Sequence, residues 1–159
     1  LLPVVVRPAL SDRLGWCVIL GTPRGHNHFF DIYQQAACIS DFSETVIEQA
    51  GQLPFRAPTI IVSCLRFQEH PKVPRDEQLC TVACATHGMQ QAAFAQGIGA
   101  IWRTGWMAED DFIKEQLGLS VDDAIVGFLY VGTPAVPTPL KPQKDSSPFF
   151  MNGNDLVLD

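Results

Sequence analysis

The feature that most constrains the fold is a long helical segment, Asp76–Gln96, which contains none of the 12 prolines of the chain. Acidic residues in its first turn favour the helix dipole, and Gly97 is a typical residue to end it. Its apolar residues recur near helical spacing at Leu79, Val82, Ala83, Met89 and Ala93. The segment is also rich in alanine, so another backbone can approach it closely.

Apolar runs alternate with further helical segments along the rest of the chain. The runs Thr59–Leu65 and Ile125–Val131 are apolar on both faces, which is typical of central strands. Further strands are expected at Trp16–Leu20 and Ala100–Arg103, and further helices at Arg24–Ala37, Phe42–Ala50 and Glu109–Leu117. Strands separated by helices indicate an α/β-type arrangement, whose strand order the sequence does not give.

Length and charge limit the classes of protein that the chain can belong to. Its 159 residues contain no repeat or linker, so we expect a single domain over residues 1–159. A net charge of −6 argues against nucleic acid as a partner. No apolar run approaches the roughly 18 residues of a membrane span. The five cysteines are an odd number, which favours a reducing, cytoplasmic protein without disulfides.

Two local patterns resemble a dinucleotide-binding site and a zinc site, but their position or number of ligands does not support either. Gly97-Ile98-Gly99 follows a helix, whereas a dinucleotide-binding glycine fingerprint follows a strand, so a Rossmann site is excluded. Cys80, Cys84 and His87 share a helical face, but a structural zinc site normally needs four ligands. We therefore predict no metal site, and a zinc-binding protein is kept as a minor alternative that elemental analysis would reveal.

Four segments occur in an order that resembles a known family. They are FRAPTIIVSC (Phe55–Cys64), EHPKVPRDEQ (Glu69–Gln78), GIGAIWRTG (Gly97–Gly105) and IVGFLYVGTP (Ile125–Pro134). The chain resembles the small single-domain branch of the nitroreductase family, from about Trp16 to Pro134. The resemblance implies an α+β sandwich with a mostly antiparallel central sheet flanked by helices. It also implies an intertwined homodimer with FMN bound at the interface.

The resemblance assigns the cofactor site mainly to Trp102, Arg103, Thr104 and Gly105. In the family this segment runs past the flavin, and its backbone amides contact the ring near the hydride-accepting nitrogen. Glycine at 105 would let the backbone approach the ring, which a Cβ would obstruct. From the residues alone, Trp102 fits equally well as an ordinary core aromatic. Arg56 also matches the family, and we expect it to be structural.

The amino end matches the family less closely. Arg7 corresponds to an arginine that helps to hold FMN, and Ser11 stands in for a histidine that the family has nearby. Nothing in Leu1–Val6 matches the family's amino-terminal helix and its Arg-Ser grip on the flavin phosphate. The chain is therefore a fragment of a longer protein or has lost that grip. We expect Lys141 and Lys144 to be solvated rather than to replace it.

The expected function is passage of a hydride from NAD(P)H through FMN to a nitroaromatic, a quinone or a similar small acceptor. The flavin supplies the difficult chemistry, so no catalytic acid or base is expected among the side chains. The family usually has tryptophan at the position of Asp76, which leaves the preferred acceptor open. The alternative is a non-catalytic or weakly flavin-binding relative that keeps the fold for interactions.

Overall fold

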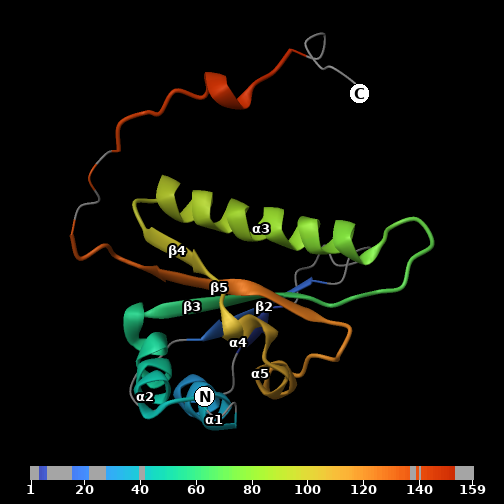
Figure 1. Ribbon diagram of the computed structural model, residues 1–159, viewed down its shortest axis with the longest axis vertical. Helices are drawn as coiled ribbons and strands as arrows, with labels where there is room; N and C mark the ends of the chain where they lie inside the picture. The colour runs from blue at the N-terminus through green and yellow to red at the C-terminus, as the bar shows by residue number, and fades with distance from the viewer. Residues whose placement is uncertain are drawn as a thin grey trace.

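The computed structural model describes residues 4–6, 16–21, 28–39, 42–136, 139 and 141–152 (Figure 1). Two residues predicted to hold the cofactor, Arg7 and Ser11, lie outside these ranges. So do residues 22–27, which include the start of the helix predicted at Arg24–Ala37. The sheet, the long helix and the segment Trp102–Gly105 are all described.

The described strands form one antiparallel sheet. Its strands are β1 (Val4–Val6), β2 (Trp16–Gly21), β3 (Thr59–Leu65), β4 (Gly99–Arg103) and β5 (Ala124–Gly132). They lie in the order β1-β2-β3-β5-β4, and every neighbouring pair is antiparallel. The α+β class with an antiparallel central sheet is therefore confirmed. The last strand in the described part of the chain, β5, lies between β3 and β4.

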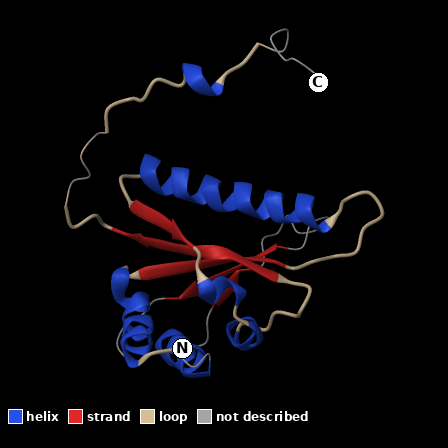
Figure 2. Cartoon of the chain, viewed as in Figure 1, coloured by secondary structure: helices blue, strands red, loops and turns tan. Residues whose placement is uncertain are grey.

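Helices cover both faces of this sheet, which explains why β3 and β5 carry apolar side chains on both faces (Figures 1 and 2). The long helix α3 (Arg75–Ala95) lies across one face, within one residue of the predicted bounds at each end. The other face carries α1 (His28–Ile39), α2 (Glu44–Gln52), α4 (Trp106–Glu109) and α5 (Asp111–Gln116). A short 3-10 helix, η1 (Leu53–Arg56), connects α2 to the region before β3.

A group of buried apolar side chains lies between the sheet and the helices α1, α2, α4 and α5. Ile60 and Val62 of β3 contribute to it, together with Phe128 and Tyr130 of β5. These side chains share a face because Ile60 pairs with Tyr130 and Val62 with Phe128. Tyr33 of α1 meets Phe128 edge to face, with ring centroids 5.8 Å apart. This packing fixes β5, and β5 in turn positions β4.

The helix predicted at Glu109–Leu117 is α5, which begins at Asp111, two residues later than predicted; the short helix α4 that precedes it was not predicted. The break falls at Asp110, whose backbone is extended at φ −69° and ψ 122°. Its carboxylate accepts a hydrogen bond of 2.9 Å from the backbone N–H of Ile113. Asp110 is therefore an N-cap, so the acidic residues that suggested one first turn belong to two helices.

We expect Asp110→Ala to lower the free energy of unfolding by about 1 kcal/mol, because the cap of α5 is lost. Asp110→Asn keeps an oxygen acceptor at the same place and should cost less. Urea unfolding of both variants measures the difference. Equal destabilisation by alanine and asparagine would contradict a capping role.

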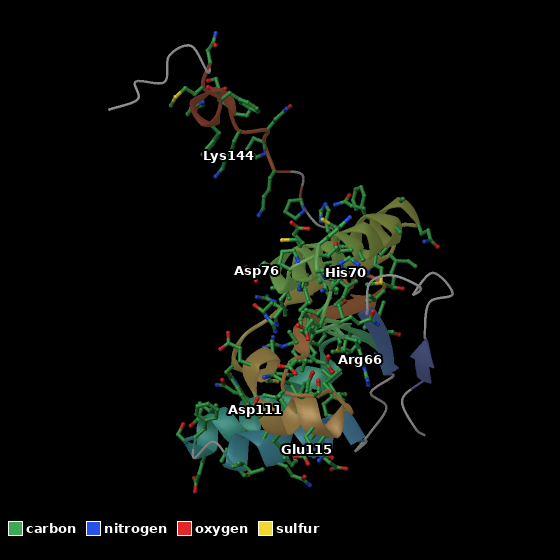
Figure 3. All side chains as sticks on the ribbon, turned by 90° about the vertical axis from the view of Figure 1, so that its right-hand side faces the viewer. Arg66, His70, Asp76, Asp111, Glu115 and Lys144 are labelled. Carbon is green, nitrogen blue, oxygen red and sulfur yellow. The ribbon has the colours of Figure 1, made fainter. Side chains whose placement is uncertain are left out.

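After β5 the described part of the chain is mostly without regular structure and extends away from the sheet (Figure 1). A single 3-10 turn, Ser147–Phe149, interrupts it. Lys141 and Lys144 are both exposed, and Figure 3 shows Lys144 well apart from the helices and sheet. Among the described helices, none is both long enough and apolar enough to cross a membrane.

Candidate functional site

A groove of about 610 Å³ runs along the edge strand β4 and the end of β5. It is lined by Arg56 from η1 and by Ile101 and Arg103 from β4. Tyr130 of β5 and Thr133, which follows β5, also line it. Ile101 pairs with Tyr130 and Arg103 with Phe128, so these residues share one face of the sheet. We call this feature the arginine groove.

Glycine allows the chain segments around the groove to pack closely. A Cβ placed on Gly132 would lie 2.6 Å from Cδ of Pro58. Since real Cβ atoms do not come so close to another atom, glycine lets Pro58 pack directly against β5. This contact holds the segment after η1, and with it Arg56, beside the end of the sheet.

The pKa of Tyr130 is subject to opposing effects of burial and of the two arginines. Burial raises the pKa of its phenol, while the positive charges of Arg56 and Arg103 act in the opposite direction. The net shift is upward, so the side chain is a neutral hydroxyl at physiological pH. The groove therefore presents two cations and a neutral hydroxyl.

The predicted segment Trp102–Gly105 ends β4 and begins α4. The side chains of Arg103 and Thr104 are exposed, and Gly105 is the N-cap of α4. Gly105 has φ +110° and ψ −173°, a backbone conformation that is essentially restricted to glycine. A Cβ placed on it would meet nothing within 4 Å. The backbone at this turn is therefore open, as a ligand that contacts it would require.

Trp102 differs from the other three because its side chain has a structural role. Side chains alternate along a strand, so Trp102 lies on the opposite face from Arg103. Its indole Nε1 donates a 3.3 Å hydrogen bond to the carbonyl of Val126, and its ring lies against Gly127. Trp102 is accordingly not among the residues that line the arginine groove.

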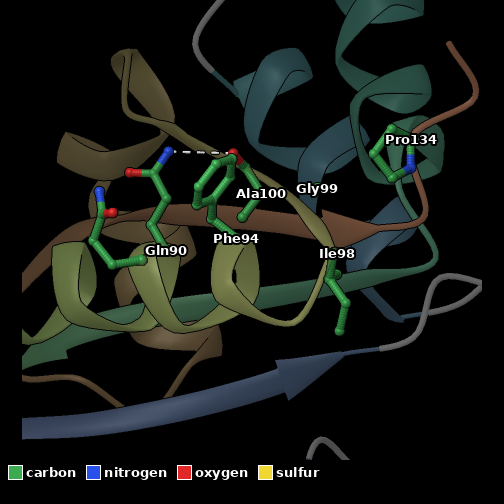
Figure 4. Close-up of a pocket in the computed structure, with 8 residues that line it drawn as sticks. Gln90, Phe94, Ile98, Gly99, Ala100 and Pro134 are labelled. Carbon is green, nitrogen blue, oxygen red and sulfur yellow. Dashed lines mark hydrogen bonds between the residues drawn. The ribbon is translucent and has the colours of Figure 1, made fainter. Parts of the chain in front are cut away.

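A second hollow, of about 630 Å³, lies at the beginning of β4 (Figure 4). It is formed by Gln90 and Phe94 of α3, the turn Gly97–Gly99, and Pro134. Gln90 donates a hydrogen bond of 3.2 Å to the carbonyl of Ala100 and so ties α3 to β4. Gly99 and Pro134 also line the arginine groove, so the two hollows adjoin.

Two groove residues, Arg56 and Tyr130, were absent from the site predicted from sequence. The FRAP string contains Arg56, but only the fold shows that the end of η1 lies near the end of β4. Tyr130 occurs in an apolar strand and gives no separate signal in the sequence. Both are brought to the groove by the pairing of β5 with β3 and β4.

The described ranges contain no cluster of ligands that would support the metal-binding alternative. No group of three or more His, Cys, Asp or Glu residues there is placed to hold a metal ion. Cys80 and Cys84 are free and exposed on α3. His87 instead lies 3.4 Å from the amide nitrogen of Gln91.

The antiparallel sheet between helices, with a cationic groove at its edge strand, makes the protein an α+β sandwich. The sequence pattern of the family described as "Nitroreductase family" matches residues 26–133. The chain therefore belongs to the nitroreductase family.

Individual relatives agree with this assignment. A protein of Escherichia coli named "Putative NAD(P)H nitroreductase YdjA" is 40% identical over 119 residues, which are 75% of this chain and 65% of that protein. The chain thus spans slightly less than two thirds of the length of this relative.

Solved structures show the same fold. The nitroreductase-like family protein from Bacillus cereus aligns with a TM-score of 0.68 at 20% identity, covering 91% of this chain and 76% of that one. A structure from Desulfovibrio desulfuricans, described as a putative nitroreductase in complex with FMN, aligns with a TM-score of 0.60 at 16% identity. That alignment covers 85% of this chain and 71% of the other.

Proposed function

We propose that the protein is an FMN-dependent oxidoreductase that transfers a hydride from NAD(P)H to a nitroaromatic, a quinone or a similar small acceptor. The observation that carries this proposal is the arginine groove, whose lining residue Arg103 lies two residues before the open backbone of Gly105. Family membership supports the reaction class, and the E. coli relative is named as an NAD(P)H nitroreductase. The structure in complex with FMN supports the choice of cofactor.

The residues of the groove fit FMN chemically. Arg56 and Arg103 supply positive charge for an anionic group, and Tyr130 supplies a neutral hydroxyl. Ile101 and Pro58 supply apolar surface for a ring or a sugar. We therefore assign cofactor binding to Arg103, Thr104 and Gly105, and to Trp102 through its backbone. Arg7 and Ser11 remain predictions for the segment that the structure does not describe.

FMN, when bound, supplies the ring that accepts and returns the hydride. The protein's part is to hold backbone donors in a fixed direction at the turn from β4 to α4. Donors fixed in advance stabilise developing negative charge without the cost of reorganisation. Gly105 permits the backbone conformation of this turn, and Arg103 places a cation beside it. No side chain needs to act as an acid or a base.

We also propose that the protein forms a homodimer, as the family resemblance implies. Helix α3 is compatible with this, because its outer surface carries small residues and the exposed side chain of Phe94. Light scattering coupled to size-exclusion chromatography measures the mass in solution. A mass of one chain across the micromolar range would contradict a stable dimer.

The proposed function predicts a specific visible spectrum. Protein incubated with FMN and then freed of excess cofactor should keep the yellow flavin band. Under anaerobic conditions the band should bleach on addition of NADH or NADPH, and it should return when a quinone or nitroaromatic is added. Protein that stays colourless would contradict the proposal and favour the alternative of a non-catalytic relative.

A further inference from the structure

We propose that Cys80 and Cys84 of α3 form a two-coordinate site for a soft, thiol-binding metal ion of the Cu(I) class. The site lies on the outer side of α3, which faces away from the sheet (Figure 1). It needs two ligands, whereas the zinc alternative needs four, and the described ranges hold no group of three placed for a metal ion. This site is independent of the arginine groove and of the proposed function.

The burial pattern of α3 turns both cysteines outward. Val82 and Thr86 are buried, and Cys84 lies midway between them in the sequence. Residues two apart in a helix point to nearly opposite sides, so Cys84 lies on the outer side. Cys80 precedes it by four residues and shares its face. Both cysteines are free and both side chains are exposed, so the pair is open to a metal ion from solvent.

Helix geometry excludes a disulfide between these two cysteines. The Cβ atoms of residues four apart on a helix are about 5–6 Å apart. A disulfide requires a Cβ separation of about 3.5–4.5 Å, so α3 would have to unwind. The first turns of α3 are held by Gln78, whose buried amide donates to the carbonyls of Gln68 and Val73 at 2.8 and 3.0 Å. The pair therefore stays as two thiols while the helix is intact.

The same spacing suits a metal ion held between two sulfur atoms. A bond from a thiolate to a first-row metal ion is about 2.3 Å long, so a linear sulfur–metal–sulfur unit spans about 4.6 Å. Rotation of the two side chains can reach this span without moving the backbone. Soft thiolate ligands select soft ions such as Cu(I). Binding releases the two thiol protons to solvent and leaves the oxidation state of the metal unchanged.

The surroundings of the pair favour a cation. Glu77 is exposed one turn before Cys80 on the same side of the helix, and its negative charge attracts cations. The one arginine of α3, Arg75, is tied to a loop by its hydrogen bond of 3.3 Å to a backbone carbonyl. One turn after Cys84, a Cβ placed on Gly88 would meet nothing within 4 Å, so this side of the pair is uncovered.

The test measures the affinity of the full chain for copper(I) alone. The ion is supplied without oxygen as its acetonitrile complex, and a coloured copper(I) chelator competes for it. Cys80→Ser and Cys84→Ser each remove one sulfur from the site. Cys38→Ser is the matched control, because Cys38 is a free and exposed cysteine on α1. Thermal unfolding of each variant shows that it is folded.

We expect wild type and Cys38→Ser to bind one equivalent of copper(I) with the same affinity. Cys80→Ser and Cys84→Ser should each bind it about a hundredfold more weakly, because the second thiolate otherwise acts at a high effective concentration. Equal affinity in all four proteins would overturn the proposal. Zinc should not bind tightly to the wild type, and zinc bound as tightly as copper would contradict a two-coordinate site.

Two further measurements test whether the site is accessible and lies within one chain. A coloured thiol reagent should detect one reactive thiol fewer in Cys80→Ser, and in Cys84→Ser, than in wild type. No difference would mean that a second copy covers the cysteines, which would overturn the proposal. Light scattering should give the same mass with and without copper, and a doubling caused by copper would show a site shared between chains. Bound copper is measured whether or not flavin is retained, so failure of the proposed function leaves this test unaffected.

Discussion

Gly105→Ala should produce a folded protein that no longer retains FMN after removal of excess cofactor. Gly105 has φ +110° and ψ −173°, a conformation that costs other residues about 1–3 kcal/mol. A Cβ at this position would meet nothing within 4 Å, so it would not clash with the protein itself. The strain would be relieved by rotation of the turn, which turns the backbone donors away from the groove, and the new methyl group would occupy the space of a bound ring.

Gly118→Ala is the matched control for this variant. Gly118 also has a positive φ, +70°, and a Cβ there would likewise meet nothing within 4 Å. It follows α5, whereas Gly105 follows the edge strand β4 and the groove residue Arg103. Both variants should lose some thermal stability, but only Gly105→Ala should lose flavin absorbance. Full FMN content in Gly105→Ala would remove Gly105 from the site.

Gly127→Ala should destabilise the protein by about 2–4 kcal/mol, from overpacking and one lost hydrogen bond. A Cβ on Gly127 would lie 2.6 Å from Cδ1 of Trp102 and 2.9 Å from the carbonyl oxygen of Arg103. The first contact forces the indole off Gly127 and away from the Val126 carbonyl. The second pushes β4 away from β5. Urea unfolding, followed by tryptophan fluorescence, measures the change.

Two further variants show whether Trp102 causes this effect. Trp102→Leu in the Gly127→Ala background should recover part of the lost stability, because the smaller side chain leaves room for the methyl group. Gly88→Ala, on an exposed turn of α3 with nothing within 4 Å, should instead stabilise by about 0.5–1 kcal/mol. If the losses in the free energy of unfolding simply add in the double variant, the proposed contact between Trp102 and Gly127 is wrong.

The elements that sequence predicts best are those with strong local signals. Strand β3 has the predicted bounds, Thr59–Leu65, because Pro58 precedes its β-branched residues and the charged Arg66 follows Leu65. Helix α3 agrees within one residue at each end, because prolines and glycine frame it. The break at Asp110 was missed because a capping aspartate and an aspartate in a first turn look alike in sequence. The pairing of Val4–Val6 with β2 also had no local signal.

The residues of the candidate site were likewise predicted only in part. The resemblance pointed to Arg103, Thr104 and Gly105; of these, Arg103 lines the groove, and the other two follow it at the turn into α4. It gave no reason to combine them with Arg56 or Tyr130, because that depends on strand order. Runs that are apolar on both faces carry no information about which strand lies beside which. The structural role of Trp102 could not be predicted either, because it depends on contact with Gly127, which only the pairing of β4 with β5 reveals.

The position of β5 in the sheet has a consequence for biosynthesis. Strands β3 and β4 leave the ribosome before β5, yet each pairs with β5 and not with the other. A nascent chain that ends before Gly132 therefore has the residues Arg56 and Arg103 but nothing to hold them at one groove. We therefore expect the groove to bind a ligand only after β5 has been synthesised and has paired with both strands.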